Sequence, residues 1–145
     1  MDNRERENRE TCKHIALEIE EIASGSVYKC PHCGELIVWN NDNYDDERAT
    51  YHCDNCGSDV DESDLEPYTL YDYFSDCFDI EYRVSGSLEY RSVQVMIACG
   101  GPNIYIDTAS KNVELYWWSE RAFYPLAIDA VEEIDALFEE YFSMR

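Results

Sequence analysis

The spacing of apolar residues follows a helical period in some parts of the chain and a strand period in others. Over residues 2–23 apolar side chains recur every three or four positions, which predicts an amphipathic helix. From residue 80 the period becomes two, which predicts strands joined by short turns in an antiparallel meander. Four strands are expected, at residues 80–84, 90–98, 103–108 and 113–118.

Two further helices are predicted, a short one before the strands and a longer one after them. Residues 69–79 place their apolar side chains on one side, with Thr69 as N-cap. In the last segment the apolar residues share one arc of a helical wheel, which we expect to pack on the sheet. They are Ala127, Ile128, Val131, Ile134, Phe138, Tyr141 and Phe142. The pattern therefore predicts an α+β fold with the meander packed against helices.

The most specific motif lies between the first helix and the strands, where CPHCG begins at residue 30 and CDNCG at residue 53. The spacing C-x2-C-x19-C-x2-C brings four thiols within reach of one ion. Zinc accepts four thiolates tetrahedrally, and this set leaves no open coordination position. One structural Zn²⁺ ion is therefore expected in a zinc-ribbon hairpin. Its predicted ligands are Cys30, Cys33, Cys53 and Cys56.

Alternatives for this motif stay open at the level of the sequence. The four thiols could form disulfides or hold a rubredoxin-like iron, and His32 or His52 could replace a cysteine. Cys12, Cys77 and Cys99 stand alone, and free thiols beside a metal site favour a reducing cytoplasm.

The expected organisation has three parts. Residues 1–25 form an N-terminal helix, and residues 26–60 form the ribbon. Residues 61–145 form an α+β domain with a short helix, a four-stranded antiparallel sheet and an acidic C-terminal helix.

Charge limits the partners that the chain can have. The sequence holds 32 Asp and Glu against 11 Lys and Arg, a net charge of −21. Nucleic acid and anionic membranes repel such a chain, and the ribbon itself is rich in acids rather than in phosphate-binding cations. Neither a signal peptide nor a membrane-spanning apolar run is recognised. The expected partner is a protein with a basic surface, without direct contact to nucleic acid or membrane.

Candidate partner-binding residues combine acids with aromatic side chains. The last helix has no Lys or Arg between Arg121 and Arg145, and repulsion among its acids costs on the order of 1–2 kcal/mol. An unrelieved anionic stripe favours a cationic partner, although it could also be a merely solvated face. Tyr and Trp nearby could anchor such an interface. The predicted contacts are Asp129, Glu132, Glu133, Asp135, Glu139, Glu140, Tyr71, Asp72, Trp117 and Trp118.

No catalytic constellation is recognised. The sequence has no G-x-S-x-G, no H-E-x-x-H and no glycine-rich phosphate loop, and the Gly-Gly-Pro at residue 100 indicates a turn. We therefore expect a protein that is not an enzyme, with a metal-dependent enzyme as an alternative.

The chain's size, its two cysteine knuckles, its acidic C-terminal helix and its lack of catalytic motifs resemble a zinc-binding type II anti-CRISPR protein of a phage or mobile element. The resemblance implies stoichiometric binding to the nucleic-acid-handling lobe of Cas9, as a partial DNA mimic, so that target DNA is not loaded. It also implies a structural zinc and the bacterial host cytoplasm as the location.

A second resemblance lies later in the chain. The segment ACGGPNIYIDT, followed by ELYWWSERAFYPL, resembles an uncharacterised domain of mobile elements, to which no activity can be assigned.

The alternative function is that of a regulator whose ribbon contacts the transcription machinery.

Overall fold

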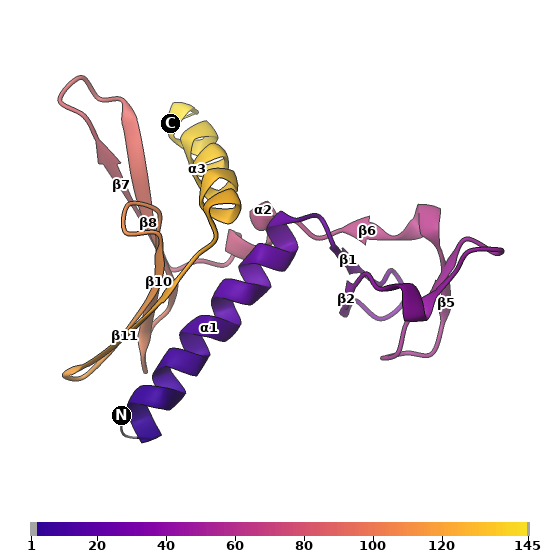
Figure 1. The fold of residues 1–145 in the computed structure, drawn as a ribbon. Helices are drawn as coiled ribbons and strands as arrows, with labels where there is room; N and C mark the ends of the chain where they lie inside the picture. The colour runs from indigo at the N-terminus through magenta and orange to yellow at the C-terminus, as the bar shows by residue number, and fades with distance from the viewer. Residues whose placement is uncertain (1–2, 145) are drawn as a thin grey trace.

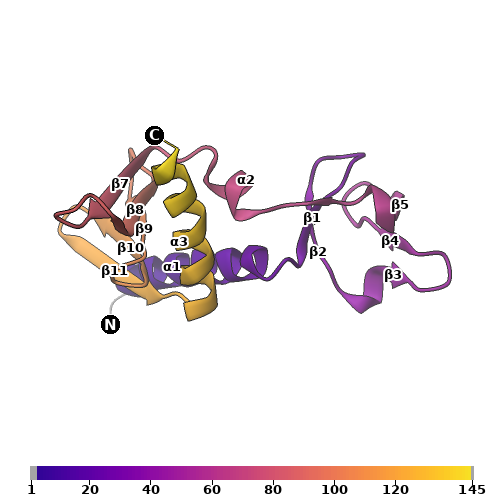
Figure 2. The ribbon, with the colours of Figure 1, turned by 90° about the horizontal axis from the view of Figure 1, so that it is seen from above.

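The computed structural model describes residues 3–144 and confirms the α+β class. Its larger part is an antiparallel sheet with all the α-helices on one side (Figure 1). Its smaller part is the cysteine-containing ribbon, which extends away from this body (Figure 2). No helix in the described range is long and apolar enough to cross a membrane.

The sheet has five strands in the order β11-β10-β9-β8-β7, each antiparallel to its neighbours. They are β7 (Asp79–Val84), β8 (Tyr90–Ala98), β9 (Asn103–Asp107), β10 (Asn112–Trp117) and β11 (Glu120–Pro125). The prediction of four strands was therefore wrong by one, because it assigned β11 to no element.

The reason is the turn between β10 and β11. Two-residue hairpin turns usually place Gly or Asn at a positive φ, and that is the signal a sequence offers. Here the first turn residue is Trp118, with a φ of 58° and a side chain that is 91% exposed. It belongs to the turn rather than to the end of a strand that continues from Trp117.

Three helices cover one face of the sheet. They are α1 (Asn3–Ala23), α2 (Leu70–Phe74) and α3 (Ile128–Ser143). The helix α1 packs on β10 and β11, whereas α3 packs on β8 and against α2. The helix α2 ends well before the predicted residue 79, because Cys77 closes a turn on Phe74 and β7 begins at Asp79.

The inner face of α3 starts one turn later than the helical wheel predicted. Ala127 caps the helix and Ile128 is exposed, whereas Ala130 and Val131 are buried together with Ile134 and Phe138. Edge-to-face contact between Phe74 and Phe138, with ring centroids 5.3 Å apart, joins α2 to α3.

Two separate hydrophobic cores hold the two parts of the molecule. The larger core joins the sheet to α1, α2 and α3, so the N-terminal helix belongs to the body rather than standing as a unit of its own. The smaller core lies in the ribbon and extends to Leu65, beyond the predicted boundary at residue 60. The ribbon then ends at β6 (Glu66–Pro67), which pairs with β1 (Val27–Lys29).

Candidate metal centre and acidic groove

The four cysteines predicted as ligands lie together at one end of the ribbon. Their Sγ atoms are all within 4.8 Å of one another. Cys30 Sγ lies 3.9 Å from Cys56 Sγ, and Cys33 Sγ lies 3.7 Å from Cys53 Sγ. A tetrahedral ion with sulfur ligands at about 2.3 Å requires edges of about 3.8 Å. The cluster therefore could hold a metal ion with this geometry.

The first knuckle connects β1 to β2 (Leu36–Val38). Gly34 N donates to the Cys30 carbonyl at 2.9 Å, and Cys30 N donates to the Glu35 carbonyl at 2.9 Å. The φ of Gly34 is 80°, a conformation that a side chain would strain. The turn thus aims two thiols in one direction.

The second knuckle connects β4 (Thr50–His52) to β5 (Asp59–Asp61) and repeats these bonds. Gly57 N donates to the Cys53 carbonyl at 2.8 Å, and Cys53 N donates to the Ser58 carbonyl at 2.9 Å. Both knuckles use the same backbone hydrogen bonds. Each knuckle therefore positions its own pair of thiols, and the two pairs meet in one cluster.

Local donors prepare two of the thiols for metal binding as thiolates. The Ser58 hydroxyl lowers the pKa of Cys56 to about 6, and the Asn55 side chain lowers the pKa of Cys33. Backbone hydrogen bonds of Cys56 lower the pKa of Cys53, but burial and hydrogen bonds with the neighbouring thiols outweigh them and raise it to about 11. A bound metal ion would hold all four as thiolates.

The structure bears on two of the alternatives left open by the sequence, the disulfides and the histidine ligands. All seven cysteines are free thiols within the described range. His52 Nδ1 lies 2.9 Å from Asp59 Oδ1, which raises the pKa of His52 and turns the ring toward β5. His32 does not belong to the metal-ligating group among residues 3–144.

Few apolar residues hold the ribbon together. Its buried core consists of Cys30, Ile37, Tyr51, Cys53, Val60 and Leu65, of which two are candidate ligands. Around this core lie the short strand β3 (Tyr44–Asp45) and the 3-10 turns Asn41–Asn43 and Glu62–Asp64. Trp39 packs its ring on Tyr44, with centroids 4.6 Å apart, and Tyr51 donates its hydroxyl to the Val38 carbonyl at 2.9 Å. Folding units with so small a core are usually supported by disulfides, a metal ion or oligomerisation.

A second candidate site lies where the ribbon joins the body. Two adjoining depressions of about 410 and 460 Å³ run beside α3, and we call them together the acidic groove. The lining of the first includes apolar surface from Tyr68, Leu70 and Leu137. Carboxylates border both depressions, and Glu133 lines the two of them. The others that line the groove are Glu20, Asp129, Glu132 and Glu140.

The structure brings some of the predicted partner-binding residues to this groove and separates others from it. Asp129, Glu132, Glu133, Glu140 and Tyr71 line the groove, and Glu139 is exposed on the same helix.

The remaining predicted residues have other places. Asp135 accepts a hydrogen bond from the Tyr90 hydroxyl at 2.6 Å. Burial, and then this hydrogen bond, raise the pKa of Tyr90. Asp72 caps α2 by accepting from Thr69 N at 2.9 Å. Trp117 and Trp118 lie at the β10–β11 turn. The carboxylates of Asp135 and Asp72 therefore each already accept a hydrogen bond from a group of the same chain.

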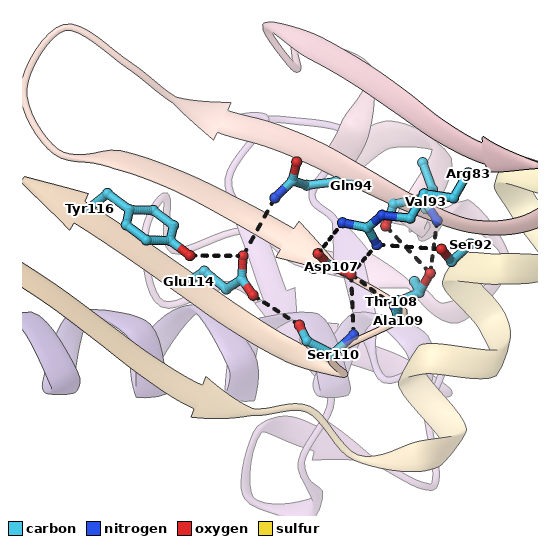
Figure 3. A network of polar contacts seen from close by, with 10 residues as sticks. All are labelled: Arg83, Ser92, Val93, Gln94, Asp107, Thr108, Ala109, Ser110, Glu114 and Tyr116. Carbon is cyan, nitrogen blue, oxygen red and sulfur yellow. Dashed lines mark hydrogen bonds and ion pairs between the residues drawn. The ribbon is translucent and has the colours of Figure 1, made fainter.

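Sequence analysis missed a network of polar side chains on the face of the sheet that carries no helix (Figure 3). Arg83 on β7 makes a bidentate ion pair with Asp107 on β9, with nitrogen–oxygen distances of 2.8 and 2.7 Å. Asp107 also accepts from Ala109 N and Ser110 N, and Ser110 Oγ donates to Glu114 at 2.9 Å. The alternation of polar and apolar residues indicates which residues share this face of the sheet. It does not predict the Arg83–Asp107 pair, because that pair spans β8 and depends on strand register.

The network predicts a dependence of stability on pH. Burial raises the pKa of Asp107, but the Arg83 ion pair and the two backbone donors outweigh it and hold the pKa below the usual 3.8. Because the folded-state pKa is the lower one, the carboxylate's contribution to stability is complete above about pH 5 and is lost as the pH falls below about 4.

The check is the difference in unfolding free energy between the wild type and Asp107→Asn, measured by urea denaturation. The difference should be constant between about pH 6 and 8 and should shrink below about pH 4. A difference that does not change over this whole range would contradict the lowered pKa.

Comparison with known proteins gives no relative for this chain. No protein-family model, no curated protein and no solved structure matches it.

Proposed function

We propose that this chain is a non-enzymatic, zinc-stabilised acidic protein that binds a cationic surface of a nucleic-acid-handling protein through its acidic groove. The four thiolates would take one Zn²⁺ ion, and with all its positions filled by protein the ion would serve structure rather than catalysis. The zinc would fix the ribbon beside the groove.

One observation carries the proposal: the carboxylates of the groove have no cation of their own. The ion pairs among residues 3–144 join Glu120, Glu18, Asp45, Asp59 and Asp107 to basic side chains. None of the acids on α3 takes part in one. Because like charges three or four residues apart destabilise a helix, a sequence selected for stability alone would mix the signs.

The groove also has the composition that a basic side chain needs. Lys and Arg carry an aliphatic stem as well as a charge, and they bind best where apolar surface lies beside an anion. Here Tyr68, Tyr71 and Leu137 supply the apolar surface, and Glu133 and Glu140 supply the anions. Complementary charge around the contact would speed association and favour basic partners over acidic ones.

The particular partner that we propose is Cas9, which the resemblance in size, cysteine knuckles and acidic helix supports. A protein groove that holds nucleic acid is densely cationic, since duplex DNA carries about one negative charge per 1.7 Å of its axis. An acidic protein bound at that groove would block the loading of target DNA.

The test replaces three groove carboxylates by amides, as Glu132→Gln, Glu133→Gln and Glu140→Gln together. Each lost ion pair at an exposed rim costs about 0.2–1 kcal/mol, so the affinity for the Cas9–guide RNA complex should fall about tenfold. Biolayer interferometry measures this affinity, and an increase from 50 to 300 mM NaCl should weaken wild-type binding. The variant should fold at least as stably as the wild type, because it removes repulsion along α3.

The matched control carries the same change in net charge on exposed positions away from the groove, Glu7→Gln, Glu10→Gln and Glu47→Gln. It should bind nearly as tightly as the wild type. Equal losses in the two triple variants would contradict the groove. If the chain does not bind Cas9 and instead recovers RNA polymerase from a bacterial lysate, its partner is the transcription machinery rather than Cas9.

A further inference from the structure

The strand β7 forms one edge of the five-stranded sheet. It pairs with β8, and no other strand among residues 3–144 pairs with its outer side. At an edge strand every second residue directs its backbone N–H and C=O outward, so an unprotected edge is a template for another strand.

The opposite edge of the sheet is protected. The helix α1 lies along β11 (Figure 1), and Arg9 Nη1 donates to the Phe123 carbonyl on that strand at 3.3 Å. The same guanidinium lies 5.4 Å from the centre of the Tyr124 ring. A cation bound to an edge carbonyl blocks the approach of a second strand.

The strand β7 has no comparable cover in the described structure, and it exposes apolar side chains. Ile80 is 37% exposed and Val84 is 41% exposed. Phe78 and Leu88, just before and after the strand, are exposed to a greater extent. Soluble proteins rarely leave a strand edge both unpaired and apolar unless another chain covers it.

We propose that β7 pairs in antiparallel fashion with β7 of a second copy of this chain, with Tyr82 opposite the partner's Tyr82. In this register Ile80 lies opposite the partner's Val84, which joins the exposed apolar side chains. Glu81 lies opposite the partner's Arg83, and the two-fold symmetry repeats each pair. Directly opposed apolar, aromatic and opposite-charge pairs all stabilise an antiparallel ladder.

Charge selects this register among its neighbours. Centring the two-fold axis on residue 81 or 83 instead of 82 would oppose Glu81 to the partner's Glu81 or Arg83 to the partner's Arg83. Directly opposed like charges are destabilising. Arg83 remains available, since its side chain is 40% exposed while it binds Asp107. The result is a symmetric dimer with one continuous sheet of strands across both copies.

The salt dependence of dimerisation should be opposite to that of partner binding at the groove. Two chains that each carry a net charge of −21 repel one another, and salt screens that repulsion. Dimerisation should therefore strengthen as NaCl increases, whereas binding of a basic partner at the groove should weaken.

The experiment is sedimentation velocity on the full chain over a range of concentrations at 50 and 500 mM NaCl. The wild type should form dimers in a concentration-dependent way. Ile80→Lys and Val84→Glu should each weaken the dimer about tenfold or more, because each puts two charges opposite apolar residues. The double variant should regain association, because position 80 faces position 84 of the partner and the two new charges have opposite sign.

The control is Ile128→Lys, which makes the same change at an exposed isoleucine on α3. It should dimerise like the wild type. A wild type that stays monomeric at high concentration and high salt would overturn the proposal, and so would a double variant as weak as the singles. Melting curves confirm that every variant is folded, so loss of dimer reports on the contact.

Discussion

Replacing Cys33 or Cys53 by serine should remove the bound metal and unfold the ribbon. A structural zinc site contributes about 10–16 kcal/mol of apparent binding free energy, and that energy is folding energy when no site exists in the unfolded chain. The ribbon has little to replace it, because its core holds only Ile37, Tyr51, Val60 and Leu65 besides two cysteines. We expect the ribbon to be unfolded in either variant at 25 °C.

The body should respond differently, because its core is separate from that of the ribbon. Circular dichroism after removal of the metal by a chelator should show the helices and the five-stranded sheet still folded, while ribbon amides lose their protection from hydrogen exchange. Elemental analysis should find one zinc ion per wild-type chain.

The control for this prediction is Cys99→Ser. Cys99 is an exposed thiol outside the cluster, so this variant should keep both the metal and the wild-type melting curve. If a chelator strips the metal and the ribbon remains protected, the ion does not hold the ribbon together.

Arg83→Ala should destabilise the body by about 3–5 kcal/mol, the usual cost of leaving a buried charge without its partner. Asp107 is only 4% exposed, and Arg83 is the cation that compensates it. The pair also joins β7 to β9 across β8, so its loss removes a side-chain link between the edge strand and the interior of the sheet. Urea denaturation at pH 7 measures the change in unfolding free energy.

Two further variants test the cause of this loss. Arg91→Ala removes an exposed arginine from the neighbouring strand β8 and should cost less than about 1 kcal/mol. Arg83→Ala combined with Asp107→Asn removes the buried charge as well as its partner, and it should be more stable than Arg83→Ala alone. Equal stability of these last two variants would show that the uncompensated charge is not the reason.

The sequence by itself determined the elements whose chemistry is local. Cys30, Cys33, Cys53 and Cys56 could be recognised as one cluster because short turns fix the direction of each pair of thiols. The helices and four of the strands followed from the period of their apolar residues, since period depends only on backbone geometry. The strand β11 was missed because its turn relies on Trp118 where such turns usually have glycine or asparagine.

Only the tertiary structure decided which of the acids are available. Asp107 and Asp135 look like their neighbours in the sequence, yet each is bound within the fold, to Arg83 and Tyr90 respectively. Glu133 and Glu140 became groove residues because α3 passes beside the junction of α1 with the ribbon. Such pairings join residues far apart in the chain and depend on strand register and helix packing. A local pattern reports which side of an element a residue occupies, but not what lies opposite it.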